Sequence, residues 1–342
     1  MINFDTIFTT ISPLVHTSET FPSPGGYTYA RNIERNIYAK NPDGKREHST
    51  IPVVQSNTIR NAIRRSLANV IYDALLSNNE KVELNQFFQL SSGGRMSAGK
   101  EMTIKERLEI IESKSSLDLM GGGFEGGLLE SSLSVGFAWP ITDQTLSTSV
   151  VPANYENESI GSPTRKQILD EISQNAKDPI KEGFRLDALS ENALDDAFSY
   201  IDSSHAAAQE KSKARKNKEK TDVKKEAKSH YYKTEAISAG IPMFCGIIIK
   251  RDSEIQAGLL LETFKKFASF PVFGGLSSKG CGFVNVEIKV SMSDGKIIKT
   301  PIKIVNSKIN WSEIEKDKIF SKWLKESAKW LSELKPDQLD VR

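Results

Sequence analysis

The chain has 342 residues, a net charge of +2, 38% hydrophobic residues and 26% charged residues. This composition is typical of a soluble globular protein with one large domain or two ordinary ones, and it excludes nucleic-acid binding through a high overall charge. The two cysteines, Cys245 and Cys281, are too few for a disulfide framework or a cysteine metal site. We expect both to be buried thiols in a cytoplasmic protein, because we find no signal pattern and no apolar stretch that could span a membrane.

Residues 1–11 alternate apolar and polar side chains, which predicts a first strand at the centre of a sheet. Residues 13–50 are polar and rich in turn-forming residues, so we expect an irregular insertion. Aromatic rings and arginines are interleaved in this insertion, and Arg31, Arg35 and Arg46 are candidate contacts to single-stranded nucleic acid. Rings of this kind stack on bases while guanidinium groups bind phosphates. A solvated insertion without a ligand is the alternative.

A helix is predicted from a cap at Ser56, Asn57 or Thr58 to about residue 77. Arg60 and Arg64 are four residues apart, so they lie on one face near the start of this helix. Both arginines can meet one phosphate chain, and the positive end of the helix dipole favours an anion there. The opposite face carries an apolar stripe of Ile59, Ile63, Leu67, Val70 and Ile71.

The middle of the chain is less distinctive. Residues 91–100 are expected to form a flexible basic loop, whose Arg95 and Lys100 are candidate RNA contacts, and a helix is predicted at 103–112. Residues 119–127 are rich in glycine and precede a predicted strand at 128–137.

Residues 143–230 change in character, with many helix-forming residues and few β-branched runs. Their last part, 209–230, holds nine Lys or Arg residues against four Asp or Glu residues. Such a run is either a solvated, disordered segment or a basic arm that binds nucleic acid.

Residues 274–282 contain four glycines between a predicted helix at 255–267 and a predicted strand at 283–290. Glycine accepts positive φ and lets a polyanion approach the backbone N–H groups, so the segment is a candidate phosphate loop. It is not a Walker loop, because Cys281 follows Gly280 and the order is helix, loop, strand. A turn without a ligand is the alternative. The candidate contacts are Ser277, Ser278, Lys279 and the N–H groups of Gly275 and Gly280.

The strand at 243–249 together with the predicted helix and strand around this loop forms the second half of a ferredoxin-like unit, and residues 1–137 supply the first half. An amphipathic helix at about 312–334 should pack on the core or on a neighbour. We therefore expect an α+β fold with an RRM-like palm at 1–12, 51–142 and 231–305, a loop insertion at 13–50, a largely helical insertion at 143–230 and a C-terminal helix at 306–342.

Three stretches resemble the RAMP superfamily of CRISPR proteins, specifically its seven-type Cas backbone subunits. That family opens its first helix with "iP.ipGSSlKGalR", and residues 51–64 follow this pattern without a gap, although Ser56 and Asn61 replace its glycines. Apart from the three stretches, residues 119–123 resemble its "lFG" element. The signature loop and the aromatic strand of the family are matched by Gly274, Gly275, Gly280, Gly282 and Phe283, and by Tyr231, Tyr232, Ala239, Gly240 and Phe244.

The length, residues 11–16 and the insertion at 143–229 look most like type IV complexes. The resemblance implies a palm with fingers and thumb that binds guide RNA (crRNA) in several copies and presents it to a DNA or RNA target, in defence against plasmids or other mobile elements. It also implies other effector subunits as partners and RNA contacts at Asn57 and His16. No cofactor, metal or membrane is implied.

Type III relatives cleave target RNA with an aspartate after the first strand, but this chain has no aspartate between Asp5 and Asp43. The four histidines show no metal-ligand spacing, so we expect no enzymatic activity. Two alternatives stay open. One is a metal-dependent enzyme that processes or cleaves RNA, with His16 and Glu19 in its site, and the other is a monomeric RRM-like RNA-binding protein.

Overall fold

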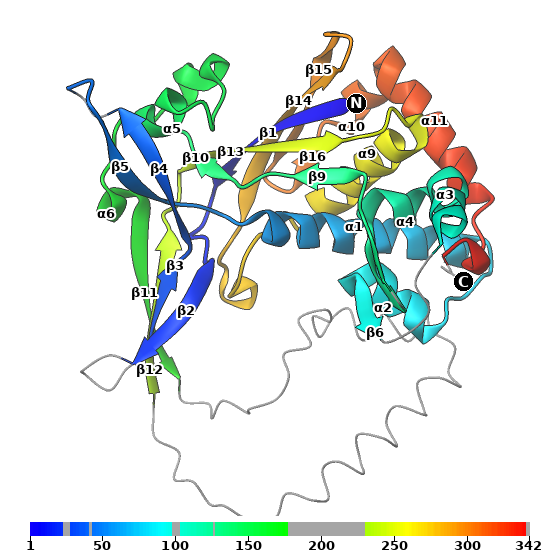
Figure 1. The fold of residues 1–342 in the computed structure, drawn as a ribbon, viewed down its shortest axis with the longest axis horizontal. Coiled ribbons are helices and arrows are strands. Elements are labelled where there is room, and N and C mark those ends of the chain that lie inside the picture. Colours follow the sequence, from blue (N-terminus) through cyan, green and yellow to red (C-terminus); the bar gives the residue numbers. More distant parts are fainter. Residues whose placement is uncertain (23–27, 41–42, 98–102, 126, 177–229, 340–342) are drawn as a thin grey trace, which may run out of the picture.

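The computed structural model describes residues 1–22, 28–40, 43–97, 103–125, 127–176 and 230–339 (Figure 1). Its described strands are β1 (Ile2–Thr10), β2 (Thr17–Pro22), β3 (Thr28–Asn32), β4 (Glu34–Lys40), β5 (Arg46–Pro52), β6 (Gly94–Ser97), β7 (Gly122–Glu125), β8 (Gly127–Leu129), β9 (Leu133–Val135), β10 (Trp139–Pro140), β11 (Leu169–Ala176), β12 (His230–Ile237), β13 (Pro242–Ile249), β14 (Val284–Met292), β15 (Ile297–Val305) and β16 (Lys308–Ile309). Its described helices are α1 (Ser56–Ser77), α2 (Leu84–Ser92), α3 (Ile104–Ser113), α4 (Ser115–Met120), α5 (Asp143–Ser147), η1 (Ala153–Glu158), α6 (Arg165–Ile168), α9 (Glu254–Ala268), η3 (Ser277–Lys279), α10 (Trp311–Lys316), α11 (Lys318–Ser332) and η4 (Pro336–Leu339).

The largest sheet is built around β1, as the alternation of its residues predicts. β1 pairs antiparallel with β13 on one side and β14 on the other, and the sheet has the order β10-β13-β1-β14-β15-β16, with β9 also on β13. Ile2, Phe4 and Phe8 are fully buried on one face of β1. The fold is therefore α+β with antiparallel sheets, and the central position of the first strand is confirmed.

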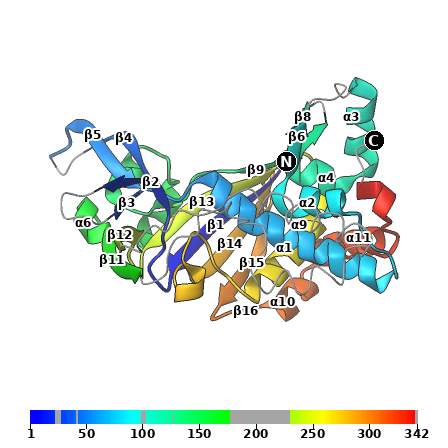
Figure 2. The same ribbon diagram turned by 90° about the horizontal axis from the view of Figure 1, so that it is seen from below.

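Helices α1 and α9 cover that buried face. Phe264 of α9 packs on Phe4 of the sheet with ring centroids 6.1 Å apart, and Phe273, which follows α9, packs on Phe8 with ring centroids 5.1 Å apart. Figure 2 shows α1, α9 and α11 on one side of the molecule and the strands β2 to β5, β11 and β12 on the other. The predicted elements at 56–77, 243–249, 255–267 and 283–290 are all present within one or two residues of their expected ends.

The predicted tail helix packs on the core, as expected. Trp323 of α11 is 2% exposed, and a Cβ added to Gly258 of α9 would lie 2.1 Å from its carbonyl oxygen, so the two helices are in close contact. The helix is divided into α10 and α11 because Asp317 interrupts it. The Asp317 carboxylate then accepts hydrogen bonds from the N–H groups of Ile319 and Phe320 and caps α11.

The irregular insertion expected at 13–50 is wrong. β2 and β3 join β12 and β11 in a second sheet, and β4 and β5 form an antiparallel hairpin. In the hairpin Ile37, Ala39 and Ile51 are buried while Tyr38, Lys40 and Thr50 are exposed, so its strands are half-buried rather than irregular. The exposed face of these strands is polar, so apolar and polar side chains alternate over too few positions to predict the strands from sequence.

Other boundaries differ as well. The strand expected at 128–137 is divided between β8 and β9, and the loop expected at 91–100 contains β6. In the described part of the insertion at 143–230, short helices are joined by β11, which pairs with β12, so this part is not largely helical. Residues 177–229, with nearly all of the basic run, lie outside the described residues.

Candidate nucleic-acid interface

The start of α1 is held by His16, which precedes β2. The Nε2 atom of His16 accepts a hydrogen bond from the backbone N–H of Gln55 at 3.0 Å, and its Nδ1 atom lies 3.2 Å from the hydroxyl of Thr58. Burial lowers the pKa of His16 to about 4, so the ring is neutral near pH 7 and can accept the Gln55 hydrogen bond. Gln55 occupies the N-cap position without a side-chain cap bond, so the cap expected from Ser56, Asn57 or Thr58 is wrong.

The glycine-rich loop at 274–282 lies next to this helix start. Gly275 donates a 2.8 Å hydrogen bond to the carbonyl of Val15, the residue before His16. The loop therefore joins helix to strand beside the start of α1, as the order of the elements predicts. Ser278 and Lys279 are exposed and Ser277 is half-buried.

The backbone of the loop is less available than the glycines suggested. The N–H of Gly275 is bound to Val15, and the N–H of Gly280 donates to the carbonyl of Ser277 at 3.0 Å. The phosphate cradle expected from these two N–H groups is therefore wrong for this conformation. Gly282 has a different role, since its φ is +84° and an added Cβ would lie 2.0 Å from the carbonyl oxygen of Phe273. Glycine at this position allows the loop to close on the core.

Arg60 and Arg64 extend from the next turns of α1 toward the C-terminal end of α4. An Nη2 atom from each arginine donates to the carbonyl of Met120, at 2.5 Å from Arg60 and 2.9 Å from Arg64. Arg64 also donates to the carbonyl of Gly121 at 3.2 Å. Arg60 is half-buried and Arg64 is 7% exposed, so only Arg60 has an accessible guanidinium in this conformation.

The two arginines form a partly desolvated cationic pair. Burial lowers the pKa of Arg60, and burial together with the charge of Arg60 lowers the pKa of Arg64 to about 10. Within the described ranges neither arginine forms an ion pair with a carboxylate. Carbonyl dipoles offset the charge only in part, and an anion placed beside Arg60 would be attracted by both guanidinium groups.

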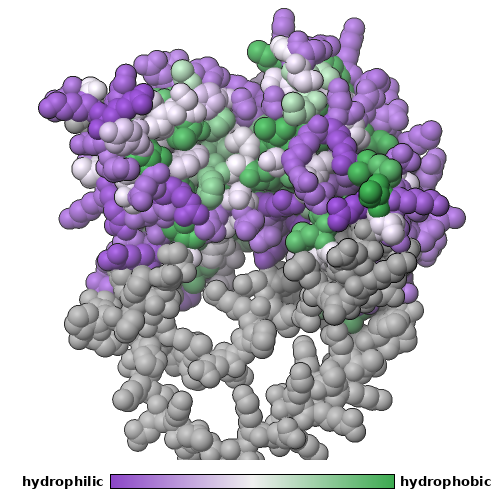
Figure 3. Space-filling model, in the orientation of Figure 1, coloured by the Kyte–Doolittle hydropathy of each residue, from purple (hydrophilic) through white to green (hydrophobic). Residues whose placement is uncertain are grey.

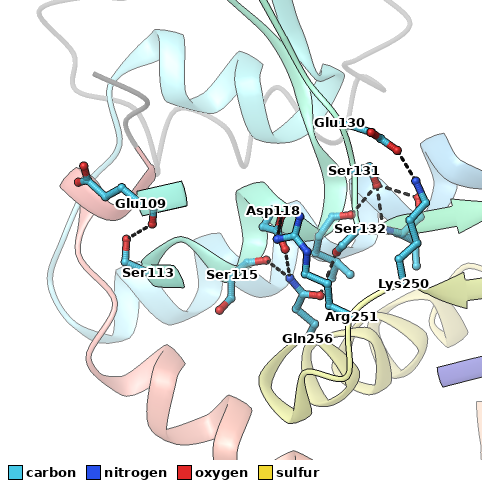
Figure 4. Close-up of polar contacts among 12 residues, drawn as sticks. Glu109, Ser113, Ser115, Asp118, Glu130, Ser131, Ser132, Lys250, Arg251 and Gln256 are labelled. Atoms are coloured by element: carbon cyan, nitrogen blue, oxygen red, sulfur yellow. Dashed lines mark hydrogen bonds and ion pairs between the residues drawn. The ribbon is translucent and has the colours of Figure 1, made fainter. Parts of the chain in front are cut away.

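A buried network fixes the helix that presents these carbonyls (Figure 4). Asp118 of α4 is fully buried and accepts hydrogen bonds from Arg251 at 2.7 Å and from Gln256 at 2.6 Å. Ser132 in turn donates to the amide oxygen of Gln256 at 2.9 Å. Burial raises the pKa of Asp118, and the Gln256 and Arg251 contacts oppose that rise. α4 is thereby tied to α9, and its last carbonyls are held in place.

The residue after α4 must be glycine. Gly121 has a φ of +60°, and an added Cβ would lie 2.5 Å from the carbonyl oxygen of Leu129. Two buried polar atoms, Nε2 of Gln89 and Oγ of Ser116, find no hydrogen-bond partner among the described residues, and both residues line a small pocket beside Arg64. Buried polar atoms without a hydrogen bond are rare in proteins. In this pocket two of them lie beside the guanidinium of Arg64. Sequence reasoning missed Asp118, Gln89 and Ser116, because no motif surrounds them.

The remaining candidates are dispersed. Asn57 is exposed on the first turn of α1, and Arg95 lies on β6, while Lys100 is outside the described residues. Arg31 and Arg46 are exposed on β3 and β5, and the guanidinium of Arg35 lies 4.9 Å from the centre of the Phe137 ring. The structure therefore brings His16, Arg60, Arg64 and the 274–282 loop together around α1. The three arginines of the insertion lie on β3, β4 and β5, strands that are on the side of the molecule opposite α9 and α11 (Figure 2).

Comparisons with known proteins were made on the whole chain. The model of the RAMP superfamily matches residues 7–285. Among solved structures, the chain is similar to one described as "Type IV-B CRISPR Complex", with a TM-score of 0.49 and 17% sequence identity over 84% of this chain and 90% of that chain. No curated protein matches the chain. In the described part of the chain, none of the helices has both the length and the hydropathy needed to cross a membrane.

Proposed function

The chain belongs to the RAMP superfamily, and from this premise we propose that it is a guide-RNA-binding backbone subunit of a multisubunit CRISPR effector complex. The observation that carries the proposal is the cationic pair of Arg60 and Arg64 on the first turns of α1, held by carbonyl groups alone. A phosphate beside Arg60 would supply the negative charge that the described partners lack, and the start of the helix favours the same charge.

The order of the central sheet supports an RRM-like palm. β1 is followed by α1, the strands β9 and β10 come next, and β13 is followed by α9 and β14. In the sheet these strands lie in the order β9 or β10, β13, β1, β14, which is the arrangement of two interlocked strand-helix-strand units. The glycine-rich loop precedes the last of these strands, where the family resemblance expects it.

RNA contacts in this proposal come from Arg60, Asn57, Ser277, Ser278 and Lys279. Arg64 and His16 position the site without contacting RNA. Arg64 orders the carbonyls next to Arg60, and His16 holds the helix start against the 274–282 loop. Several copies would bind one guide RNA in the cytoplasm together with other effector subunits, as in type IV complexes, and the guide would pair with a DNA or RNA target.

We propose binding rather than catalysis. Among the described residues the histidine beside the site is His16, whose two ring nitrogens contact Gln55 and Thr58 at the start of α1 and whose pKa is lowered to about 4, so it is a poor general base near pH 7. The metal-dependent enzyme based on His16 and Glu19 is for this reason the weaker hypothesis.

Purification of the protein with a transcribed CRISPR array tests the proposal. Native mass spectrometry should show complexes in which one RNA carries several copies of the chain, and the RNA should be a guide. One copy per RNA would favour the monomeric RRM-like alternative. Mg²⁺-dependent cleavage of labelled guide or target RNA would favour the enzyme. Purified protein without RNA, and without affinity for it, would overturn the proposal.

A further inference from the structure

A second surface with the features of a nucleic-acid contact lies on the β4–β5 hairpin, which precedes α1 in the chain. Its strands pair so that Tyr38 is opposite His48 and Lys40 is opposite Arg46. Because side chains alternate between the two faces of a strand, these four residues share one face of the hairpin. We refer to them as the hairpin face. All four are exposed. In the view of Figure 3, hydrophilic residues cover this part of the molecule, at the upper left.

The other face of the hairpin is anchored to the body of the protein. Ile37, Ala39 and Ile51 are buried and pack with Trp139 of β10. The backbone N–H of Lys40 also donates to the hydroxyl of Ser147 in α5 at 3.2 Å. The hairpin face is therefore presented by a supported two-stranded ribbon, and a ligand would not have to pay the entropy of ordering a loose loop.

An aromatic pair occupies the middle of the hairpin face. The rings of Tyr38 and His48 lie 5.1 Å apart at an angle of 54°, and Tyr38 is 54% exposed. The pairing holds the tyrosine ring in one orientation while leaving much of its surface open to solvent. Every nucleic-acid base has a flat apolar surface that can stack on such a ring, regardless of sequence.

Two cations lie directly opposite each other beside the aromatic pair. Like charges in a cross-strand pair destabilise a hairpin, so Lys40 and Arg46 are an unfavourable choice for folding alone. In the part of the chain that the structure describes, neither forms an ion pair with a carboxylate. A polyanion bound across this end of the hairpin would remove the repulsion. Tyr38 and Lys40 are about 7 Å apart along the strand, so one nucleotide can reach both.

We propose that the hairpin face binds single-stranded nucleic acid, with a base stacked on Tyr38 and His48 and the neighbouring phosphates held by Lys40 and Arg46. β5 ends at Pro52 and α1 begins at Ser56, so a strand that leaves the arginine pair can continue toward the hairpin. The inference adds a second surface to the proposed function. It rests on the proposed function only for the class of ligand, a nucleic acid. Its evidence is separate, because in the described structure the polar contacts of the α1 site are made by other residues.

Binding of a labelled, unstructured RNA by variants of the full chain tests the inference. Tyr38→Ala with His48→Ala should weaken binding by about tenfold or more, the loss expected for one stacked base, without changing the salt dependence. Lys40→Ala with Arg46→Ala should reduce the slope of log K against log salt by about 1.4, since two phosphate contacts are lost. Lys299→Ala with Lys308→Ala removes two exposed lysines from β15 and β16 and should change neither quantity.

Two further measurements distinguish the loss of RNA binding from unfolding of the variants. Tyr38→Phe keeps the ring and should bind like the parent, and all variants should melt near the parent temperature because the replaced side chains are exposed. If the alanine pair lowers the melting temperature, Tyr38→Leu with His48→Gln retains the bulk and should show the same loss of affinity. RNA containing 4-thiouridine should crosslink to the hairpin face, and mass spectrometry locates the crosslinked residue.

The outcomes separate this inference from the proposed function. If the parent binds RNA through Arg60 but the hairpin variants bind like the parent, without a crosslink at the hairpin, the inference is overturned and the proposed function stands. If only the hairpin variants lose affinity, the assignment of RNA binding to the α1 site is wrong. If the hairpin variants keep RNA affinity and lose association with another protein subunit, the surface is a protein interface and the inference fails. A parent chain without affinity for nucleic acid would overturn both.

Discussion

Arg60 and Arg64 illustrate how two identical side chains on one helix face acquire different roles. Both donate to the carbonyl of Met120, but Arg64 is 7% exposed and donates to Gly121 as well. Its removal would leave buried carbonyls without a donor, which costs more than the loss of one exposed contact. The difference arises from position along the helix, because Arg64 also reaches the carbonyl of Gln89 in α2 and that of Gly121 after α4.

Arg60→Ala should reduce the slope of log K for guide RNA against log salt by about 0.7, the value for one phosphate contact of a single strand, and should leave the melting temperature nearly unchanged. Arg64→Ala should instead lower the melting temperature clearly. Arg65→Ala, an exposed arginine of the same helix, is the matched control and should alter neither quantity by as much. An unchanged salt slope in Arg60→Ala would contradict the assignment of the α1 site.

His16 should make the stability of the protein depend on pH. Its pKa is lowered from 6.5 to about 4, so the unfolded chain takes up a proton at a pH where the folded chain does not. The free energy of unfolding is therefore highest above the ordinary histidine value and falls as the pH decreases from 6.5 to about 4, by roughly 2 kcal/mol. His16→Gln should remove much of this decrease, whereas His48→Gln, at an exposed position, should retain it. Chemical denaturation over this pH range measures both, and identical pH profiles for parent and His16→Gln would rule out the capping role.

At the scale of the elements, the 274–282 loop contains glycines of two kinds. Gly280 has a φ of +79° but nothing within 4 Å of an added Cβ, whereas a Cβ at Gly282 would meet the carbonyl of Phe273. The first position therefore needs glycine only for its backbone angle, and the second also needs the space. Neither requirement depends on a ligand.

Gly280→Ala should destabilise the protein by about 1 kcal/mol, the cost of positive φ for a residue with a side chain. Gly282→Ala should cost more than twice as much, because the clash with backbone is added to the same strain. Urea unfolding of the two variants measures the difference. Equal effects would mean that the loop moves to make room for a side chain at position 282, and the expected clash with the Phe273 carbonyl would not occur.

The contact between α9 and α11 makes the C-terminal helix part of the core. Trp323 is 2% exposed and its ring lies 5.7 Å from that of Phe320, so Trp323→Ala should destabilise the protein by about 3 to 5 kcal/mol. Trp330→Ala, on a half-buried part of the same helix, is the matched control and should cost less. If thermal unfolding showed Trp323→Ala to be as stable as the parent, α11 would not be docked on α9.

At the scale of the molecule, the prediction concerns the basic run. Residues 209–229 lie outside the described structure, and a polar, charged segment buries little apolar surface. Deletion of these residues should leave the melting temperature unchanged while reducing the number of copies that assemble on one guide RNA. Native mass spectrometry and differential scanning calorimetry supply the two readouts. A collapse of the melting transition with normal assembly of the folded fraction would contradict a role of this segment in assembly on the guide RNA.

The sequence by itself determined the central architecture. β1, α1 and β14 bury mainly one face against the core, so their apolar residues repeat with the period of their own backbone, whereas β13 and α9 are buried on most sides and read as apolar runs; both patterns are local information. The proximity of the 274–282 loop to the start of α1 followed from the order of these elements. The pairing of Arg60 and Arg64 on one face followed from the helical period.

Only the tertiary structure decided how the site residues are used. The neutral ring of His16, the burial of Arg64 and the occupied N–H of Gly275 each depend on a partner distant in sequence, such as Gln55, Met120 or Val15. The hairpin of β4 and β5 likewise owes its buried face to Trp139. Hydrogen-bond partners and desolvation are set by which surfaces meet in the folded chain, and no local pattern of residues encodes them.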